Sequence, residues 1–275
     1  NAGSCSLVDF NRTGTPLIEI VTEADMRSSQ EAYDYLTTLK LTLQYLGVSD
    51  CDMEKGSLRC DANVSIRPLG QKEFGTKTEL KNMNSFSAVK KAIDYEVARH
   101  TQVILSGGKI VQETLLWNDE KGITITMRSK EQAHDYRYFP DPDLVPFTVD
   151  YKVIDQVRAE LPELPQAKLE RFVKHYGLSE YDAGVLVMDQ DLTKFFESCV
   201  ELFNQPKKIV NWLTGALLKE MNERKAAIND LKIDPKALVD LIKSVEDSVV
   251  SNLVGKEVLA EMLNSGKTAT VIIQE

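Results

Sequence analysis

Residues 57–81 read SLRCDANVSIRPLGQKEFGTKTELK, and this stretch decides the fold of the N-terminal half of the chain. Polar and apolar residues alternate on both sides of a short link at 68–72. Because side chains two positions apart share one face of a strand, the alternation predicts a β-hairpin with strands over 57–66 and 73–81. Pro68 and Gly70 in the link are typical of a hairpin loop.

One face of this predicted hairpin is polar. The side chains on it that carry chemistry are Arg59, Asp61, Asn63, Glu79 and Lys81. A turn centred near residue 70 predicts three cross-strand pairs: Asp61 with Glu79, Arg59 with Lys81, and Asn63 with Lys77. Like charges directly opposite each other on a strand pair are destabilising, so this register requires something that offsets both like-charged pairs.

A divalent cation with a bound phosphate group is one way to offset these charges. Mg²⁺ takes carboxylate oxygens and bridges to substrate phosphates, and Arg or Lys side chains nearby bind those phosphates. The polar face is therefore a candidate magnesium-nucleotide site. The alternative is a solvated sheet face of mixed charge, and periodicity alone leaves both interpretations open.

A second stretch, LVDFNRTGTPLIEIV at residues 7–21, places one carboxylate in an apolar strand. Leu17, Glu19 and Val21 are predicted to share a face. An ionised carboxylate among apolar neighbours needs a cation, a set of hydrogen bonds or a raised pKa. The alternative is a glutamate on an edge strand that reaches water.

Four stretches of the chain resemble one known family. They are LVDFNRTGTPLIEIV at 7–21, EKGSLRCDANVS at 54–65, TELKNMNSF at 78–86 and DYRYFPDPD at 135–143. In this order they are similar to the family of B subunits of tRNA-dependent aspartyl/glutamyl amidotransferases. The resemblance covers residues 6–150 almost continuously and extends more loosely over the helical remainder.

The resemblance implies an enzyme that acts on misacylated tRNA. Members of the family use ATP and Mg²⁺ to phosphorylate the side-chain carboxylate of Glu or Asp carried on glutamine or asparagine tRNA, and ammonia then displaces the phosphate. The implied partners are the glutaminase of the amidotransferase, its small third subunit, and the misacylated tRNA. A tRNA-docking and assembly module without catalysis of its own is the alternative.

The resemblance also assigns candidate residues. Glu19 and Glu79 match glutamates that hold magnesium in the family. We add Asp61 as a further metal ligand because it shares the polar face. On the same ground we predict that Arg59, Asp61, Asn63 and Lys81 contact ATP.

The chain departs from the family pattern in three places. It begins at Asn1, near the middle of the family's catalytic domain, so further metal ligands of the family are expected to be missing. It ends at Glu275, where the family continues into a small helical tail. Leu115 follows Thr114 where the family usually has Arg, which argues against a polar role at position 115.

Composition indicates a cytoplasmic enzyme. The formal net charge of −9 argues against broad nucleic-acid binding by electrostatics alone, and we expect no DNA partner. Any contact with tRNA must be local, for example through Lys168, Arg171 and Lys174 on one predicted helix, and the alternative is that these cations form a solvated helix face. No apolar run approaches the roughly 18 residues of a membrane span, and we expect no membrane partner. The four cysteines show no zinc-site spacing and are expected to be reduced thiols.

The predicted fold class is α+β. Residues 1–150 are expected to form part of a catalytic domain, the C-terminal half of a cradle in which an antiparallel sheet packs against helices. One of these helices is predicted to open with a capping box at Ser28–Glu31 and to run to about Leu46, and another is predicted to follow Asn84 and to stop at Gly107 and Gly108. Residues 151–275 are expected to form an all-helical, tRNA-facing domain. His100 and His175 are expected on helix surfaces and are given no catalytic role.

Overall fold

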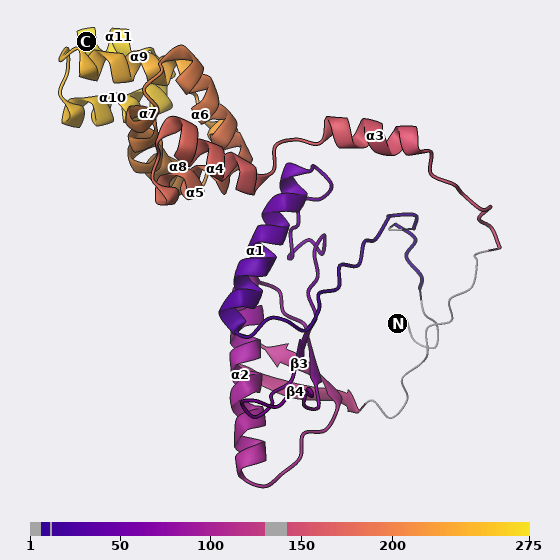
Figure 1. Cartoon of the computed structure of the whole chain (residues 1–275). Helices are drawn as coiled ribbons and strands as arrows, with labels where there is room; N and C mark the ends of the chain where they lie inside the picture. The colour runs from indigo at the N-terminus through magenta and orange to yellow at the C-terminus, as the bar shows by residue number, and fades with distance from the viewer. Residues whose placement is uncertain (1–6, 12, 130–141) are drawn as a thin grey trace. The chain divides into compact units, whose positions relative to one another are not determined.

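The computed structural model describes residues 7–11, 13–129 and 142–275 (Figure 1). Contacts between residues divide the chain into two units, the first from residues 1–36 and 60–131 and the second from residues 37–59 and 132–275. In the described ranges the first unit is a sheet with helices and the second is helical. The predicted α+β class with a helical C-terminal region is therefore confirmed.

The sheet of the first unit has four strands in the order β1-β2-β3-β4. Their bounds are Ala62–Val64 for β1, Thr78–Lys81 for β2, Glu113–Asn118 for β3 and Ile123–Ser129 for β4. The pairs β1–β2 and β3–β4 are antiparallel, as expected, whereas β2 and β3 are parallel. The sheet is mixed because helix α2 carries the chain from one end of β2 back to the start of β3, and parallel neighbours need such a crossover.

The first hairpin is shorter than its alternating sequence predicts. Strands β1 and β2 comprise three and four residues, and residues 65–77 between them form no strand. The connection is therefore much longer than the predicted link at 68–72. For a second hairpin the sequence predicts strands over 110–117 and 122–128, and the antiparallel pair β3–β4 confirms this.

Helix α2, Phe86–Leu105, covers one face of the sheet (Figure 1). Ser85 caps its N-terminus, with its hydroxyl accepting a hydrogen bond from the backbone N–H of Ala88 at 3.0 Å, a preferred arrangement at a helix start. The core between helix and sheet consists of Leu36, Val64, Leu80, Met83, Ala88, Val89, Ala92, Leu115 and Trp117. Leu80 and Leu115 point into this core, so Glu79 and Lys81 point to the opposite face.

The predicted strand around Glu19 is wrong. Residues 7–11 and 13–23 carry no regular strand (Figure 1). The side chains of these residues are exposed. Leu17, Ile18 and Val21 are 94%, 73% and 80% exposed. A strand depends on hydrogen bonds to a neighbour, and none of the four described strands pairs with this segment.

The second unit is built from helices. Their bounds are α3 Tyr151–Glu160, α4 Pro165–Tyr176, α5 Glu180–Val187, α6 Gln190–Leu202, α7 Pro206–Asn211, the π-helix η1 Trp212–Leu217, α8 Leu218–Arg224, the 3₁₀ helix η2 Ile228–Asp230, α9 Pro235–Glu246, α10 Asn252–Ser265 and α11 Ala269–Gln274. Helix α3 has no buried residue. The other helices enclose a large apolar core that includes Phe172, Phe196, Leu213, Leu241 and Leu259.

Helix α1, Ser29–Tyr45, ends in the core of the second unit. The buried hydroxyl of Tyr45 donates a hydrogen bond to the carbonyl of Val187 at 2.9 Å and lies 3.4 Å from the hydroxyl of Thr193. Burial raises the pKa of Tyr45, which keeps its phenol protonated. A residue from the N-terminal sixth of the chain therefore completes the packing of the helical unit.

Gly255 of α10 allows close packing inside the second unit. A Cβ atom at this position would lie 2.7 Å from Cγ2 of Val245 and 3.0 Å from Cη2 of Trp212. We expect Gly255→Ala to lower the free energy of unfolding by about 1–2 kcal/mol, because overpacking outweighs the better helix propensity of alanine. Urea denaturation followed by circular dichroism measures this change.

Gly184 in α5 supplies the matched control. A Cβ atom there meets nothing within 4 Å, so Gly184→Ala is expected to leave stability unchanged or raise it by up to about 1 kcal/mol. Equal stability of the two variants would contradict the packing argument.

Two further properties concern the described residues of both units. No helix in the described ranges is long and apolar enough to cross a membrane. Cys51, Cys60 and Cys199 are free thiols. Burial raises the pKa of Cys60 to about 11 and that of Cys199 to about 12, so both are protonated at neutral pH.

Candidate functional site

The polar face of β1 and β2 brings together most of the predicted site residues, in a register different from the predicted one. Asn63, not Asp61, lies opposite Glu79, and Ala62 lies opposite Leu80. The predicted pairs Asp61–Glu79, Arg59–Lys81 and Asn63–Lys77 are therefore wrong. The register moves by two residues because the connection over 65–77 is longer than a tight hairpin loop. A shift of two keeps every side chain on its predicted face.

Lys81 is the central cation of this face. Its ammonium forms ion pairs with Asp61 Oδ2 and with Glu79 Oε1, the latter at 3.3 Å. Burial lowers the pKa of Lys81, but the hydrogen bond to Asp61 and the two negative charges outweigh this effect and raise it. The like-charge repulsion expected from the sequence is thus replaced by attraction between opposite charges.

Glu79 is held on its other side by Thr114 of β3. The Thr114 hydroxyl donates a hydrogen bond to Glu79 Oε2 at 2.8 Å. The side chain of Glu79 is 19% exposed and that of Asp61 is 49% exposed. Glu79 is therefore the more firmly placed of the two carboxylates.

The donor set of this face fits a hard cation in part. Oxygens of Asp61 and Glu79 converge on one positive charge, and Asn63, with a carboxamide oxygen, is the cross-strand neighbour of Glu79. Carboxylate and amide oxygens are suitable ligands for Mg²⁺. The described residues contain no group of three or more His, Cys, Asp or Glu side chains placed to hold a metal ion.

Glu19 and Arg59 are not brought into this face. Glu19 lies in the exposed segment before α1, so the predicted ligand set of Glu19, Asp61 and Glu79 is not assembled in the described part of the chain. Arg59 is exposed, lies three residues before β1 and belongs to the second unit by its contacts. The family-like stretch at 135–143 falls mostly on residues 130–141, outside the described residues.

The proposed basic patch on α4 is largely neutralised. Arg171 binds both carboxylate oxygens of Glu163, at 2.8 and 2.7 Å, and also pairs with Glu197. Lys168 lies 3.0 Å from Glu197. The hydrogen bond from Arg171 lowers the pKa of Glu163. These cations serve the packing of α4 against α6, which leaves less charge for nucleic acid.

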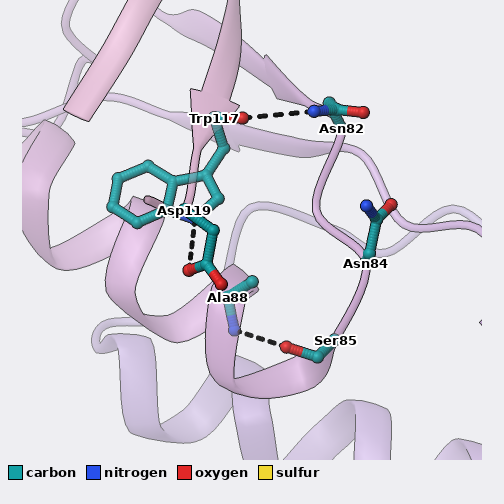
Figure 2. A pocket seen from close by; sticks show the side chains of 6 residues that line it. All are labelled: Asn82, Asn84, Ser85, Ala88, Trp117 and Asp119. Atoms are coloured by element: carbon teal, nitrogen blue, oxygen red, sulfur yellow. Dashed lines mark hydrogen bonds between the residues drawn. The ribbon is translucent and has the colours of Figure 1, made fainter. Parts of the chain in front are cut away.

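A pocket of about 240 Å³ lies beyond the carboxyl ends of β2 and β3, beside the first turn of α2 (Figure 2). It is lined by Asn82, Asn84, Ser85, Ala88, Trp117 and Asp119. Asn82 has a positive φ of 66° and donates to the carbonyl of Trp117 at 3.2 Å, while Trp117 Nε1 donates to Asp119 at 3.1 Å. The lining includes one carboxylate, already engaged, so the paired carboxylates of the β1–β2 face remain the better candidate for a cation.

Sequence reasoning missed Thr114 and the buried polar residues of α2. Thr114 lies in the stretch QETLLW, in which only Leu115 departs from the family pattern. Leu115 is 2% exposed in the core, which agrees with the absence of a polar role there. His100, expected on a helix surface, is fully buried.

Comparison with known proteins gives one consistent result. The GatB/GatE catalytic domain family matches residues 1–155 and the GatB domain family matches residues 194–275. The chain is 49% identical over 270 residues to a protein of Carboxydothermus hydrogenoformans, and 52% identical over 273 residues to one of Brevibacillus brevis. Both relatives are named as the B subunit of aspartyl/glutamyl-tRNA(Asn/Gln) amidotransferase.

A third relative with this name, from Caldicellulosiruptor bescii, is 51% identical over 273 residues. The matches cover 98–99% of this chain but only 56–57% of the relatives. The chain thus spans little more than half the length of these relatives.

Proposed function

Because the chain belongs to the GatB/GatE catalytic domain family, we propose that it forms the activating part of an amidotransferase that works on misacylated tRNA. The proposed substrate is Glu carried on glutamine tRNA, or Asp carried on asparagine tRNA. The proposed partners are a glutaminase and a small third subunit, in the cytoplasm. The names of the relatives support this proposal.

The proposed reaction has two steps. First, an oxygen of the substrate's side-chain carboxylate attacks the γ-phosphorus of ATP, and ADP leaves. Then ammonia from the glutaminase attacks the resulting acyl phosphate, releasing inorganic phosphate and the amide. Phosphoryl transfer of this kind depends chiefly on positioned cations rather than on a protein nucleophile.

The observation that carries the proposal is the convergence of Asp61 and Glu79 on one cation. Asp61 directly precedes β1 and Glu79 lies in β2, and both carboxylates meet the ammonium of Lys81. Mg²⁺ held by these oxygens would neutralise charge on the phosphates of ATP. Lys81, on the same strand as Glu79, is paired with both carboxylates and would turn to phosphate oxygens once Mg²⁺ took those carboxylates, and Asn63 is the cross-strand neighbour of Glu79.

Reconstitution tests the proposal. The chain, extended to the length of its relatives, is combined with the two partner proteins and supplied with glutamyl-tRNA, ATP, Mg²⁺ and glutamine. We expect glutaminyl-tRNA to form only when ATP and Mg²⁺ are both present, with one ADP released per amide. Amidation without ATP hydrolysis would contradict the activation role. Tight tRNA binding with no ADP release would support the docking module instead.

A further inference from the structure

We infer that Thr114 is a positioning residue for Glu79. Its hydrogen bond to one carboxylate oxygen, Oε2, leaves the other oxygen, Oε1, facing the proposed metal ion. The inference rests on the proposed role of Glu79 in holding a metal ion. Thr114 Oγ1 donates to Glu79 Oε2 at 2.8 Å, whereas Oε1 lies 3.3 Å from Lys81 Nζ. The two oxygens of one carboxylate therefore have different partners.

Strand pairing fixes Thr114 in this place. In the parallel register of β2 and β3, Thr114 is directly opposite Glu79, and Leu115 is opposite Leu80. Thr114 is fully buried, and a β-branched side chain has few χ1 rotamers. Leaving a buried hydroxyl without a hydrogen-bond partner also destabilises the folded protein. Rotation of Glu79 away from Thr114 would therefore leave the hydroxyl unpaired.

This arrangement reduces the freedom of Glu79. A glutamate side chain has three χ angles, and an ionised carboxylate on a strand otherwise samples several rotamers. The hydrogen bond to Oε2 selects the rotamers that direct Oε1 toward the ammonium of Lys81. Partners that orient a ligating carboxylate typically affect metal affinity or activity 10–100-fold.

Binding of Mn²⁺ as a probe for Mg²⁺ tests the inference without measuring activity. The extended chain is titrated with Mn²⁺ and the free ion is followed by electron paramagnetic resonance. We expect Thr114→Val, which keeps the shape but removes the hydroxyl, to weaken Mn²⁺ binding by about 10–100-fold. Thr114→Ser keeps the hydroxyl, and its affinity for Mn²⁺ is expected to lie within about threefold of the wild-type value. If only the methyl group of Thr114 mattered, Thr114→Ser would weaken Mn²⁺ binding as well.

Glu79→Gln separates failure of this inference from failure of the proposed function. If Glu79→Gln weakens Mn²⁺ binding but Thr114→Val does not, the positioning role is overturned while the metal role stands. If Glu79→Gln itself leaves Mn²⁺ binding unchanged, the proposed metal role fails as well. Should Thr114→Val not fold, Thr114→Ala also removes the hydroxyl and replaces it in the same comparison with Thr114→Ser.

Discussion

Glu79→Gln is expected to reduce ATP-dependent amidation of glutamyl-tRNA by at least about 100-fold, while the glutaminase partner continues to release ammonia from glutamine. Glutamine keeps the size of the side chain and can still accept the Thr114 hydrogen bond, so folding should survive. What is lost is one of the two negative charges around Lys81. Loss of a residue that orients a metal ligand typically lowers metal affinity or activity about 10–100-fold. Loss of the proposed ligand itself should therefore lower amidation by at least about 100-fold.

The assay compares amidation and glutaminase activity in the same reconstituted enzyme. Glu73→Gln is the matched control, because Glu73 is an exposed glutamate in the connection between β1 and β2. It undergoes the same chemical change and should retain wild-type amidation. Unchanged amidation in Glu79→Gln would contradict the proposed metal role of Glu79 and would leave the polar face with a structural role. Equal loss of amidation in Glu73→Gln would show that the effect is not specific.

The second large effect is expected at Glu96, in a buried polar cluster between α2 and the sheet. The side chains of Glu96 and His100 are both fully buried. Arg99 Nε donates to Glu96 Oε1 at 2.6 Å, and His100 Nε2 lies 3.2 Å from the same oxygen. His100 Nε2 is also 3.2 Å from the Thr78 hydroxyl, which ties the cluster to β2.

Glu96→Gln is expected to lower the free energy of unfolding at pH 7 by about 2–3 kcal/mol. Removing one partner of a buried ion pair leaves the other charge uncompensated, which typically costs about 3–5 kcal/mol. The effect is smaller here because Arg99 is 29% exposed and lies 3.7 Å from Glu113, a second carboxylate. Urea denaturation of the two proteins measures the difference.

The difference should depend on pH. Burial by itself raises the pKa of Glu96, but hydrogen bonds from His100 and Arg99 and the charge of Arg99 outweigh burial and lower it below the ordinary value of 4.5. A group with a lowered folded-state pKa stabilises the protein above its unfolded-state pKa and loses that contribution as the pH falls. The gap between wild type and Glu96→Gln should therefore be full at pH 7 and narrow below about pH 4.5.

Asp94→Asn is the control for this experiment. Asp94 lies on the same helix, two residues away, but is exposed. Its change should alter stability by no more than about 0.5 kcal/mol. A gap between wild type and Glu96→Gln that stays constant from pH 7 to pH 3 would contradict the ionised state of Glu96.

Periodicity predicted which side chains share the polar face, but not which of them are opposite each other. The face depends only on the two-residue repeat of a strand, so Asp61, Asn63, Glu79 and Lys81 were placed together. The register depends on the length of the connection, and residues 65–67 and 73–77 keep an alternating pattern without forming strands. Local sequence could not reveal where the hydrogen-bonded ladder stops.

The pairing of strands far apart in the sequence could not be predicted from local sequence either. The parallel contact between β2 and β3 joins residues 35 positions apart, as the Thr114–Glu79 hydrogen bond shows. The segment around Glu19 has the pattern of a strand but pairs with none of the described strands. By contrast, the buried position of His100 had a local signal, because Val89, Ala92, Glu96 and His100 follow one another at helical spacing on a single stripe.

The hydrogen bond between Tyr45 and Val187 has a consequence for synthesis on the ribosome. The two residues are 142 positions apart in the sequence. At 5–20 residues per second, Tyr45 is synthesised roughly 7–28 s before its acceptor is made. During that interval the end of α1 has no core to enter, so the nascent chain carries an unburied aromatic helix end, a site at which a chaperone that binds apolar segments would act.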